Sequence, residues 1–208
     1  MKQQLKFFSD ASNFEESAPT VLEGFRYQPN LIEPADEDRL IEHVRELPFK
    51  EFEFHGYLGK RRVVSFGWQY EFSGSGRLRK ADDVPEFLLR LRMRAAAFAQ
   101  MEPEALQHVL VIEYGPGAGI GWHRDKPVFG EVVGVSLVAP CLLRFRRKMD
   151  SKSKGRNKWQ RVNVLAEPRS AYHLSGPARL VWEHSILRVD SLRYSVTFRN
   201  VLEESLKA

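Results

Sequence analysis

The sequence contains one cysteine, Cys141, among 208 residues. A single thiol cannot form an internal disulfide bond and cannot provide a cysteine-rich zinc site. Because Cys141 stands within an apolar run, we interpret it as a buried structural thiol. The sequence thus excludes a disulfide-stabilised scaffold and a cysteine-rich metal site.

Long hydrophobic runs are also missing. No stretch approaches the roughly 20 apolar residues that a membrane-spanning helix needs. The first ten residues, MKQQLKFFSD, lack the apolar core of a signal peptide. We therefore expect a cytoplasmic protein without a membrane partner, and leave a nuclear location open.

Neither sign of charge dominates strongly. Lys and Arg number 32 and Asp and Glu 27, which gives a net charge of +5. This excess makes a polyanionic partner possible, although many basic enzymes bind no nucleic acid. With 43% hydrophobic and 12% aromatic residues, the chain has enough apolar material to fold, and its length suits one domain over residues 1–208.

Two segments have the apolar periodicity of helices. The first opens at Pro34 with an acidic first turn, which the helix dipole favours, and Pro48 ends it. The second covers residues 85–101, and its arginines are interpreted as a solvated face. The inward stripes consist of Leu40, Ile41, Val44 and Leu47 in the first helix and Phe87, Leu88, Leu91 and Ala95 in the second.

The rest of the chain reads as short strands. Residues 1–20 are a polar lead-in and 50–76 form a β-like aromatic segment. Strands are predicted at 21–27, 52–72, 108–114, 132–145 (divided or bent at Pro140), 161–166, 170–174, 178–184 and 192–199. This order predicts an α+β, mainly β fold, with two helices on one side of an antiparallel sandwich or barrel over residues 108–201.

A possible metal site begins in the stretch Gly-Ile-Gly-Trp-His-Arg-Asp at 119–125. On an extended backbone His123 and Asp125 point to the same side. His184, at the end of a later predicted strand, could join them, and two imidazoles with one carboxylate suit a non-haem Fe(II) site. Alone, His-x-Asp is more simply a surface turn, and a lone His on an apolar face is often a core residue.

The segment 193–199 alternates between apolar and polar residues. Arg193, Ser195, Thr197 and Arg199 share its polar face, which spans about 20 Å in a strand. Guanidinium groups bind carboxylates in pairs of hydrogen bonds, so this face suits a small dicarboxylate. The simpler alternative is a strand with one wet face.

Taken together, these motifs resemble one family. The order Tyr-Gly-Pro-Gly-x-Gly-Ile-Gly-Trp-His-x-Asp, a later His, and Arg-Tyr-x-x-Thr-Phe-Arg nine residues beyond it is similar to AlkB-like Fe(II)/2-oxoglutarate-dependent dioxygenases. The resemblance runs from about residue 25 to 201. It implies a double-stranded β-helix (jelly-roll) core, a substrate-recognition lid, and the use of Fe(II), 2-oxoglutarate and O2.

The resemblance also implies roles for individual residues. The catalytic iron ligands would be His123, Asp125 and His184. The residues around 2-oxoglutarate would be Tyr114 and Arg193 at its distal carboxylate, Arg199 near the metal, and Ser195 and Ser136 lining the pocket.

The implied reaction is hydroxylation of a C–H bond, which releases formaldehyde when the carbon is a methyl group on nitrogen.

The segment 62–70 resembles the family's nucleotide-recognition lid, so alkylated DNA or RNA is the expected substrate and no protein partner is indicated. Aromatic and basic groups there suit an extruded base and its phosphates, although they could equally be hairpin core. The candidate substrate contacts are Tyr57, Arg62, Trp68 and Tyr70. A basic loop at 148–158 could follow a nucleic-acid backbone or be a solvated insertion.

Two positions depart from the family's DNA-repair members. Ile112 stands where they have an Asn that contacts the co-substrate, and Pro127 stands where an acidic residue lies near the target base. Both departures weaken the assignment of alkylated bases. An oxygenase acting on a protein side chain or small molecule, or a catalytically silent nucleic-acid-binding domain, therefore remains an alternative.

Overall fold

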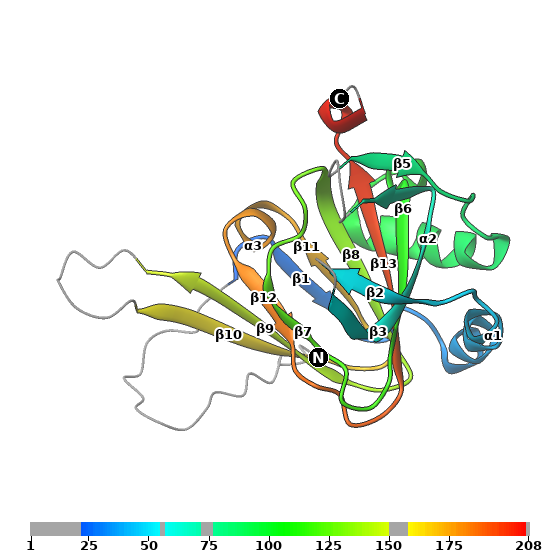
Figure 1. Cartoon of the computed structure of the whole chain (residues 1–208), viewed down its shortest axis with the longest axis horizontal. Helices are drawn as coiled ribbons and strands as arrows, with labels where there is room; N and C mark the ends of the chain where they lie inside the picture. The colour runs from blue at the N-terminus through cyan, green and yellow to red at the C-terminus, as the bar shows by residue number, and fades with distance from the viewer. Residues whose placement is uncertain (1–21, 55–56, 72–76, 150–157, 207–208) are drawn as a thin grey trace, which may run out of the picture.

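The computed structural model describes residues 22–54, 57–71, 77–149 and 158–206. Two antiparallel sheets form its body (Figure 1). The large sheet has the order β1 (Phe25–Gln28), β11 (Ala171–Leu174), β8 (Phe129–Leu137), β13 (Arg193–Val201), β6 (His108–Tyr114), β3 (Tyr57–Phe66) and β2 (Lys50–Phe54). The small sheet has the order β10 (Trp159–Ala166), β9 (Cys141–Lys148), β12 (Glu183–Ile186) and β7 (Ile120–His123). This mainly β, jelly-roll arrangement confirms the predicted fold class.

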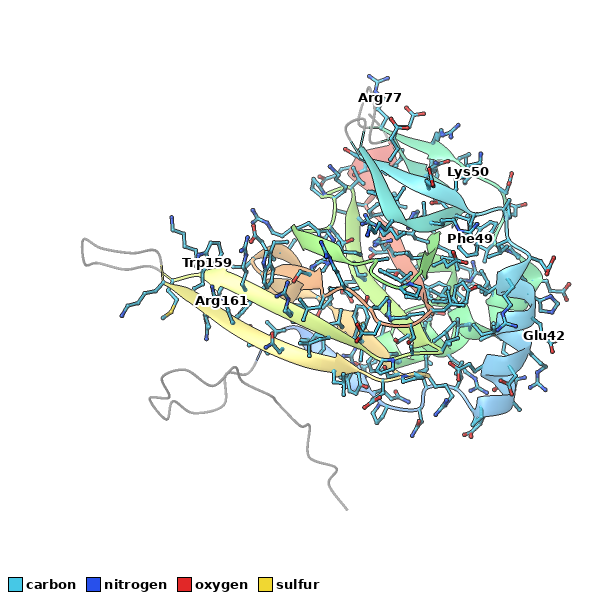
Figure 2. The ribbon with its side chains drawn as sticks, turned by 60° about the horizontal axis from the view of Figure 1, so that its bottom comes forward. Glu42, Phe49, Lys50, Arg77, Trp159 and Arg161 are labelled. Carbon is cyan, nitrogen blue, oxygen red and sulfur yellow. The ribbon has the colours of Figure 1, made fainter. Side chains whose placement is uncertain are left out.

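One hairpin projects from the body. Strands β9 and β10 run outward together, and Trp159 and Arg161 lie on this extension (Figures 1 and 2). Its connection lies outside the described residues, as does the predicted lead-in. A separate two-stranded ribbon pairs β4 (Trp68–Tyr70) with β5 (Leu78–Lys80). Within the described ranges, no helix is long and apolar enough to cross a membrane.

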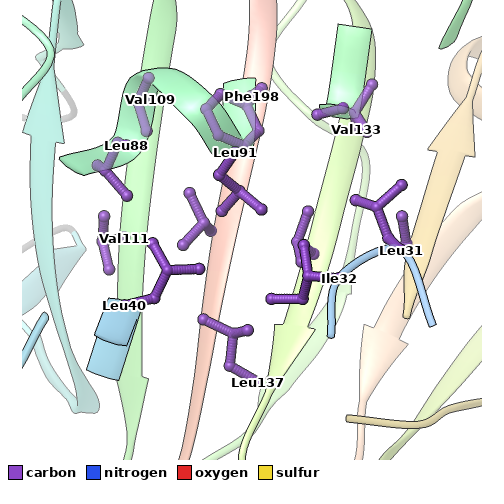
Figure 3. Packing of buried hydrophobic residues seen from close by; sticks show 14 of the residues in the cluster. Leu31, Ile32, Leu40, Leu88, Leu91, Val109, Val111, Val133, Leu137 and Phe198 are labelled. Atoms are coloured by element: carbon purple, nitrogen blue, oxygen red, sulfur yellow. The ribbon is translucent and has the colours of Figure 1, made fainter. Parts of the chain in front are cut away.

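Two helices cover the outer face of the large sheet, as predicted. Helices α1 (Pro34–Arg45) and α2 (Glu86–Ala99) bury their apolar stripes in one cluster with the sheet. Figure 3 shows Leu88 and Leu91 packed with Val109 and Phe198. Burial of these side chains is the main force that attaches the helices.

The acidic first turn of α1 does more than complement the helix dipole. Asp36 forms ion pairs with Arg90 and Arg94 of α2, and its closest oxygen to the Arg94 guanidinium lies at 3.0 Å. Glu37 is buried and pairs with Arg169 at 2.9 Å. The arginines of α2 are therefore partly structural, since they join the two helices.

Strand β13 separates the two layers of the core. Its apolar residues pack toward the helices, in the outer cluster. Its polar side chains, Arg193, Ser195, Thr197 and Arg199, are 0%, 2%, 3% and 8% exposed. The alternative of a strand with one wet face is therefore wrong: the polar face lines the interior between the sheets.

The predicted strand at 178–184 is wrong in its first part. Residues there form a short helix, α3 (Gly176–Leu180), because Pro177 at its first turn favours helix initiation. Leu180 is 65% exposed whereas Trp182 is buried, so the two do not share a face.

The first strand begins at Phe25 rather than at 21, while the division of 132–145 at Pro140 is confirmed. Short 3-10 helices occupy Pro103–Ala105 and Glu203–Leu206.

Candidate metal centre and adjoining cleft

Strands β7 and β12 bring three potential metal ligands together. In their antiparallel pairing His123 stands directly opposite His184, and Asp125 follows two residues after His123. Ligand atoms of the three side chains all lie within 4.8 Å of one another, and the two imidazole centroids are 4.3 Å apart. The set could hold one metal ion on one side and leave its other positions open.

Arg199 orients the carboxylate of this set. Its Nη2 and Nε donate to Oδ1 of Asp125 at 2.9 and 3.2 Å, while Oδ2 lies 3.5 Å from Nε2 of His184. Burial alone would raise the pKa of Asp125, but Arg199 and the two imidazoles outweigh it and lower that pKa well below its usual range. The carboxylate is therefore ionised, and one oxygen is directed toward the imidazoles.

The two histidines are suited to act as neutral ligands. Burial lowers the pKa of His184 to about 4, against the opposing effect of Asp125. Nδ1 of His123 lies 2.9 Å from the carbonyl oxygen of Gly121, to which it can only donate. In the neutral tautomer that this hydrogen bond selects, Nδ1 carries the proton and Nε2 is the ring nitrogen presented to a metal.

Two polar residues near the site were not predicted. Arg179 is buried and donates to the carbonyls of Lys126, Phe129 and Gly130 at 2.7, 2.6 and 2.7 Å, which shapes the loop after Asp125. In the sequence, the only sign of a special role for Arg179 was its place within an otherwise apolar stretch.

The other is His108, which is buried beside Arg199, with 3.4 Å between its Nδ1 and the arginine Nη1. Burial and Arg199 hold the pKa of His108 well below its usual range. The ring is therefore neutral, and Nδ1 can accept from the guanidinium.

Arg193 lies at the opposite end of the polar face of β13. Its Nε donates to Oγ of Ser136 at 3.3 Å, and its guanidinium carbon lies 4.8 Å from the ring centroid of Tyr114. Nη1 and Nη2 are buried and have no hydrogen-bond partner among the described residues. Burial of an unpaired cation is costly, so the chemistry of this group suits a bound carboxylate.

The three residues that lie side by side near Arg193 are two serines and one apolar residue. Ser195 is buried opposite Ser136 on one side and Ile112 on the other. Because Ile112 has no polar side-chain atom, it offers no hydrogen bond to a ligand. Ile112, the departure noted in the sequence, therefore lies beside Ser195 and Ser136 on three adjacent strands.

A cleft of about 790 Å³ opens beside the candidate metal centre. Asp125, His108 and Arg199 lie at its floor, and β2, β3, β4 and β5 contribute to its walls. The Nζ of Lys126 lies 5.1 Å from the ring centroid of Tyr70, so the loop after Asp125 contacts the β4–β5 ribbon. A substrate in this cleft would have direct access to the metal position.

The structure separates the four predicted substrate contacts. Tyr70 lines the cleft, whereas Trp68 and Arg62 are not among its lining residues. Arg62 instead forms a double ion pair with Glu113 at 2.7 and 2.9 Å, and Lys80 covers the ring of Trp68 at 4.2 Å. The side chain of Tyr57 lies outside the described residues.

A jelly roll with two imidazoles on paired strands, a carboxylate just after one of these strands and a buried arginine beside it defines a non-haem iron oxygenase. A family model described as the 2OG-Fe(II) oxygenase superfamily matches residues 24–199. The chain belongs to this superfamily, whose chemistry depends on Fe(II), 2-oxoglutarate and O2, and its sequence is AlkB-like.

Several known proteins are similar to this chain. It is 28% identical over 175 residues to an Arabidopsis thaliana protein named "Alkylated DNA repair protein ALKBH8 homolog", covering 69% of this chain and 50% of that protein. It is 30% identical over 134 residues to "Probable RNA/DNA demethylase ALKBH6" of Danio rerio, covering 64% and 53%. The chain thus spans about half of each of these relatives.

Two further similarities extend over most of the chain. "Uncharacterized protein L905" of Acanthamoeba polyphaga mimivirus is 24% identical over 202 residues, with 89% of each chain covered. The solved structure of OsALKBH1 superposes with a TM-score of 0.63 at 15% identity, covering 87% of this chain and all of the other. This structural similarity supports the fold.

Proposed function

We propose that this enzyme oxidatively demethylates N-alkylated bases in DNA or RNA. The observation that carries the proposal is the cleft, which runs from Asp125 of the metal centre to the aromatic β4–β5 ribbon. Relatives named as an alkylated DNA repair protein and a probable RNA/DNA demethylase support the same substrate class.

The metal and co-substrate would occupy the polar interior. His123, Asp125 and His184 would bind the iron, and Arg193 with Tyr114 would bind the distal carboxylate of 2-oxoglutarate. When bound, iron and 2-oxoglutarate supply the oxidising power for C–H hydroxylation. Arg199 holds Asp125 in place, and the buried setting of Arg193 excludes water from the carboxylate.

The chemistry of the cleft suits a methylated base. Methylation of a ring nitrogen in adenine or cytosine makes the base cationic, and acidic side chains stabilise such a cation. Four acidic residues besides Asp125 line the cleft among five basic ones: Glu51, Glu53, Glu71 and Asp82 with Lys50, Arg79, Lys80, Lys126 and Arg199. Tyr70 offers an aromatic face for stacking on an extruded base.

The outer face of the small sheet suits a nucleic-acid backbone. The Arg146 guanidinium lies 4.4 Å from the ring centroids of both Trp122 and Trp159, and Arg144 lies 4.9 Å from Trp122. Arg161 stands opposite Arg146 on the neighbouring strand and is exposed. Cations interleaved with aromatic rings are a common way to bind single strands.

The test is turnover of oligonucleotides that carry 1-methyladenine, 3-methylcytosine or an etheno adduct, as DNA and as RNA. We expect release of an aldehyde (formaldehyde from the methylated bases) together with succinate, and loss of both in Asp125→Ala. An unmethylated oligonucleotide of the same sequence is the control. Succinate formation without aldehyde release from any of these substrates would contradict the proposal.

A second candidate is an oxygenase that acts on a protein side chain or small molecule. Arg62 favours it, because this predicted phosphate contact is paired with Glu113 instead of facing the cleft. Pro127, in place of an acidic residue after Asp125, is also exposed and does not line the cleft. Succinate turnover that no oligonucleotide stimulates would favour this candidate.

A further inference from the structure

His108 places a hydrogen-bonding group at the floor of the cleft that none of the roles above uses. It is the first residue of β6, pairs directly with Arg199 of β13, and lines the cleft together with Asp125. The centroid of its ring lies 4.5 Å from that of Phe129, at an interplanar angle of 37°. Only 3% of His108 is exposed, so packing holds the ring and its two nitrogens point in fixed directions.

Arg199 determines which ring nitrogen of His108 carries the proton. A guanidinium group can only donate hydrogen bonds, and its Nη1 lies 3.4 Å from Nδ1 of His108, so Nδ1 is the acceptor. Burial and the neighbouring Arg199 hold the pKa of His108 well below its usual range, so the ring is neutral and has a single N–H group. That group is therefore at Nε2, which is a hydrogen-bond donor.

This donor is available to a molecule in the cleft. Within the described ranges, Nε2 of His108 has no hydrogen-bond partner in the protein. The fully buried side-chain nitrogens without a partner in those ranges belong to Arg92 and Arg193. Nε2 of His108 is therefore not sealed inside the protein, and the cleft that His108 lines is the space open to it.

The floor of the cleft, formed by Asp125, His108 and Arg199, offers side-chain donors and no free side-chain acceptor. Oδ1 of Asp125 accepts from Arg199, and Oδ2 approaches His184 in the candidate metal centre. The other acidic lining residues belong to the walls. Pro127 is exposed and does not line the cleft. A substrate group that accepts hydrogen bonds therefore matches the floor, and one that donates does not.

From this arrangement we infer that His108 selects, among N-methylated bases, those that carry a carbonyl oxygen next to the methylated nitrogen. Such bases are N1-methylated hypoxanthine and N3-methylated uracil or thymine. Their carbonyl oxygen lies beside the methyl carbon, so it reaches the floor when the methyl group faces the metal position, and Nε2 of His108 donates to it. In 1-methyladenine an amino group stands at that place and meets a donor instead. The inference rests on the proposed function and refines its substrate class.

The main test compares two oligonucleotides that differ at one position of one base. N1-methylhypoxanthine has a carbonyl group at C6, and 1-methyladenine has an amino group there. We expect the ratio of kcat/KM for the keto base to that for the amino base to fall about threefold to tenfold in His108→Phe, the effect of one neutral hydrogen bond. Any change in Arg199 affects both substrates alike, so the ratio reports the direct contact. The ratio of the affinities of the metal-free protein for the two oligonucleotides, measured by fluorescence anisotropy, should fall by the same factor.

His108→Gln is the conservative variant. Its amide nitrogen can donate from about the place of Nε2, and its oxygen can accept from Arg199, so we expect the ratio to stay within about twofold of that of the wild type. His43→Phe is the matched control, because His43 is exposed on α1 and does not line the cleft. It should leave both rates unchanged.

Heteronuclear NMR of the metal-free protein with isotopically labelled histidines tests the donor without any turnover. The signals of His108 are those that disappear in His108→Gln. We expect a proton on Nε2 and none on Nδ1 at neutral pH. A proton on Nδ1, or on both nitrogens, would overturn the inference even if His108→Phe failed to fold.

The outcomes separate this inference from the proposed function. If succinate forms but no methylated base is demethylated, the proposed function is wrong and the inference falls with it. If methylated bases are demethylated and His108→Phe has the same ratio as the wild type, only the selectivity of His108 is overturned. An equal loss of both activities in that variant would show that His108 acts only by positioning Arg199.

Discussion

At the scale of single residues, the two arginines of β13 differ in what surrounds them. Arg199 is paired with Asp125, whereas both terminal nitrogens of Arg193 lack a partner within the described residues. An unpaired buried cation destabilises the unliganded protein, and a paired one leaves an uncompensated charge when it is removed. Substitution of the two should therefore change stability in opposite directions.

We predict that Arg193→Met stabilises the metal-free protein by about 1–2 kcal/mol, while Arg199→Met destabilises it by about 3–5 kcal/mol because Asp125 loses its partner. Urea unfolding of both variants, without metal or 2-oxoglutarate, measures the two free energies. Arg193→Met should nevertheless lose binding of 2-oxoglutarate. Destabilisation by Arg193→Met of the same size as by Arg199→Met would show that Arg193 is not an uncompensated charge.

Single residues also show where sequence reasoning succeeds. The His-x-Asp pair and the alternation of β13 are local patterns, so the positions of His123, Asp125 and Arg193 could be read before the fold was known. Arg179 could not, because its partners are main-chain carbonyls about 50 residues earlier in the chain.

At the scale of elements, the helices and most strands follow from periodicity. The exception before β12 shows the limit of that argument: residues 178–184 alternate in hydrophobicity, but Gly176 and Pro177 initiate a helix. In this helix Arg179 donates to the carbonyl of Lys126, in the loop after Asp125. The register that sets His123 opposite His184 is likewise a property of strand pairing.

The β9–β10 hairpin carries a prediction at this scale. If its outer face follows a nucleic-acid backbone, Lys148→Gln with Arg161→Gln should weaken binding of a methylated single strand. The slope of log affinity against log salt concentration should become shallower by about 1.4, since each phosphate contact on a single strand contributes roughly 0.7. Fluorescence anisotropy at several salt concentrations gives this slope.

The matched control removes two positive charges elsewhere. Arg39 and Arg45 are exposed on α1, on the outer side of the large sheet. Arg39→Gln with Arg45→Gln should leave the slope unchanged. If both double variants reduce it equally, binding depends on net charge and not on the hairpin face.

At the scale of the whole molecule, the site is built from both sheets. The small sheet provides His123 and His184, and the large sheet provides Arg193, Arg199 and Tyr114. The cleft adds residues from the β2–β5 region, which reaches the site through pairing of β3 with β6. No local pattern in the sequence contains this long-range assembly, so the sequence could not show that Tyr70 lines the cleft while Trp68 and Arg62 do not.

In the proposed arrangement the metal and the co-substrate connect the two sheets, so we expect their binding to stabilise the whole chain, the metal first and the co-substrate after it. A ligand at a hundred times its Kd adds about 2.7 kcal/mol to the free energy of unfolding, which in a protein of this size raises Tm by about 5–11 °C. We predict such a rise when 2-oxoglutarate is added to the Mn(II)-loaded protein. Differential scanning fluorimetry measures it, with succinate as a control for ionic effects.

Variants from the two sheets separate the contributions. In Arg193→Met, Mn(II) alone should still raise Tm, but 2-oxoglutarate should add little. In His184→Ala, neither should raise it, because the co-substrate then lacks the metal that binds its keto acid end. A His184→Ala protein that 2-oxoglutarate stabilises as strongly as the wild type would show that the co-substrate binds on the large sheet alone, and that the metal centre does not join the two sheets.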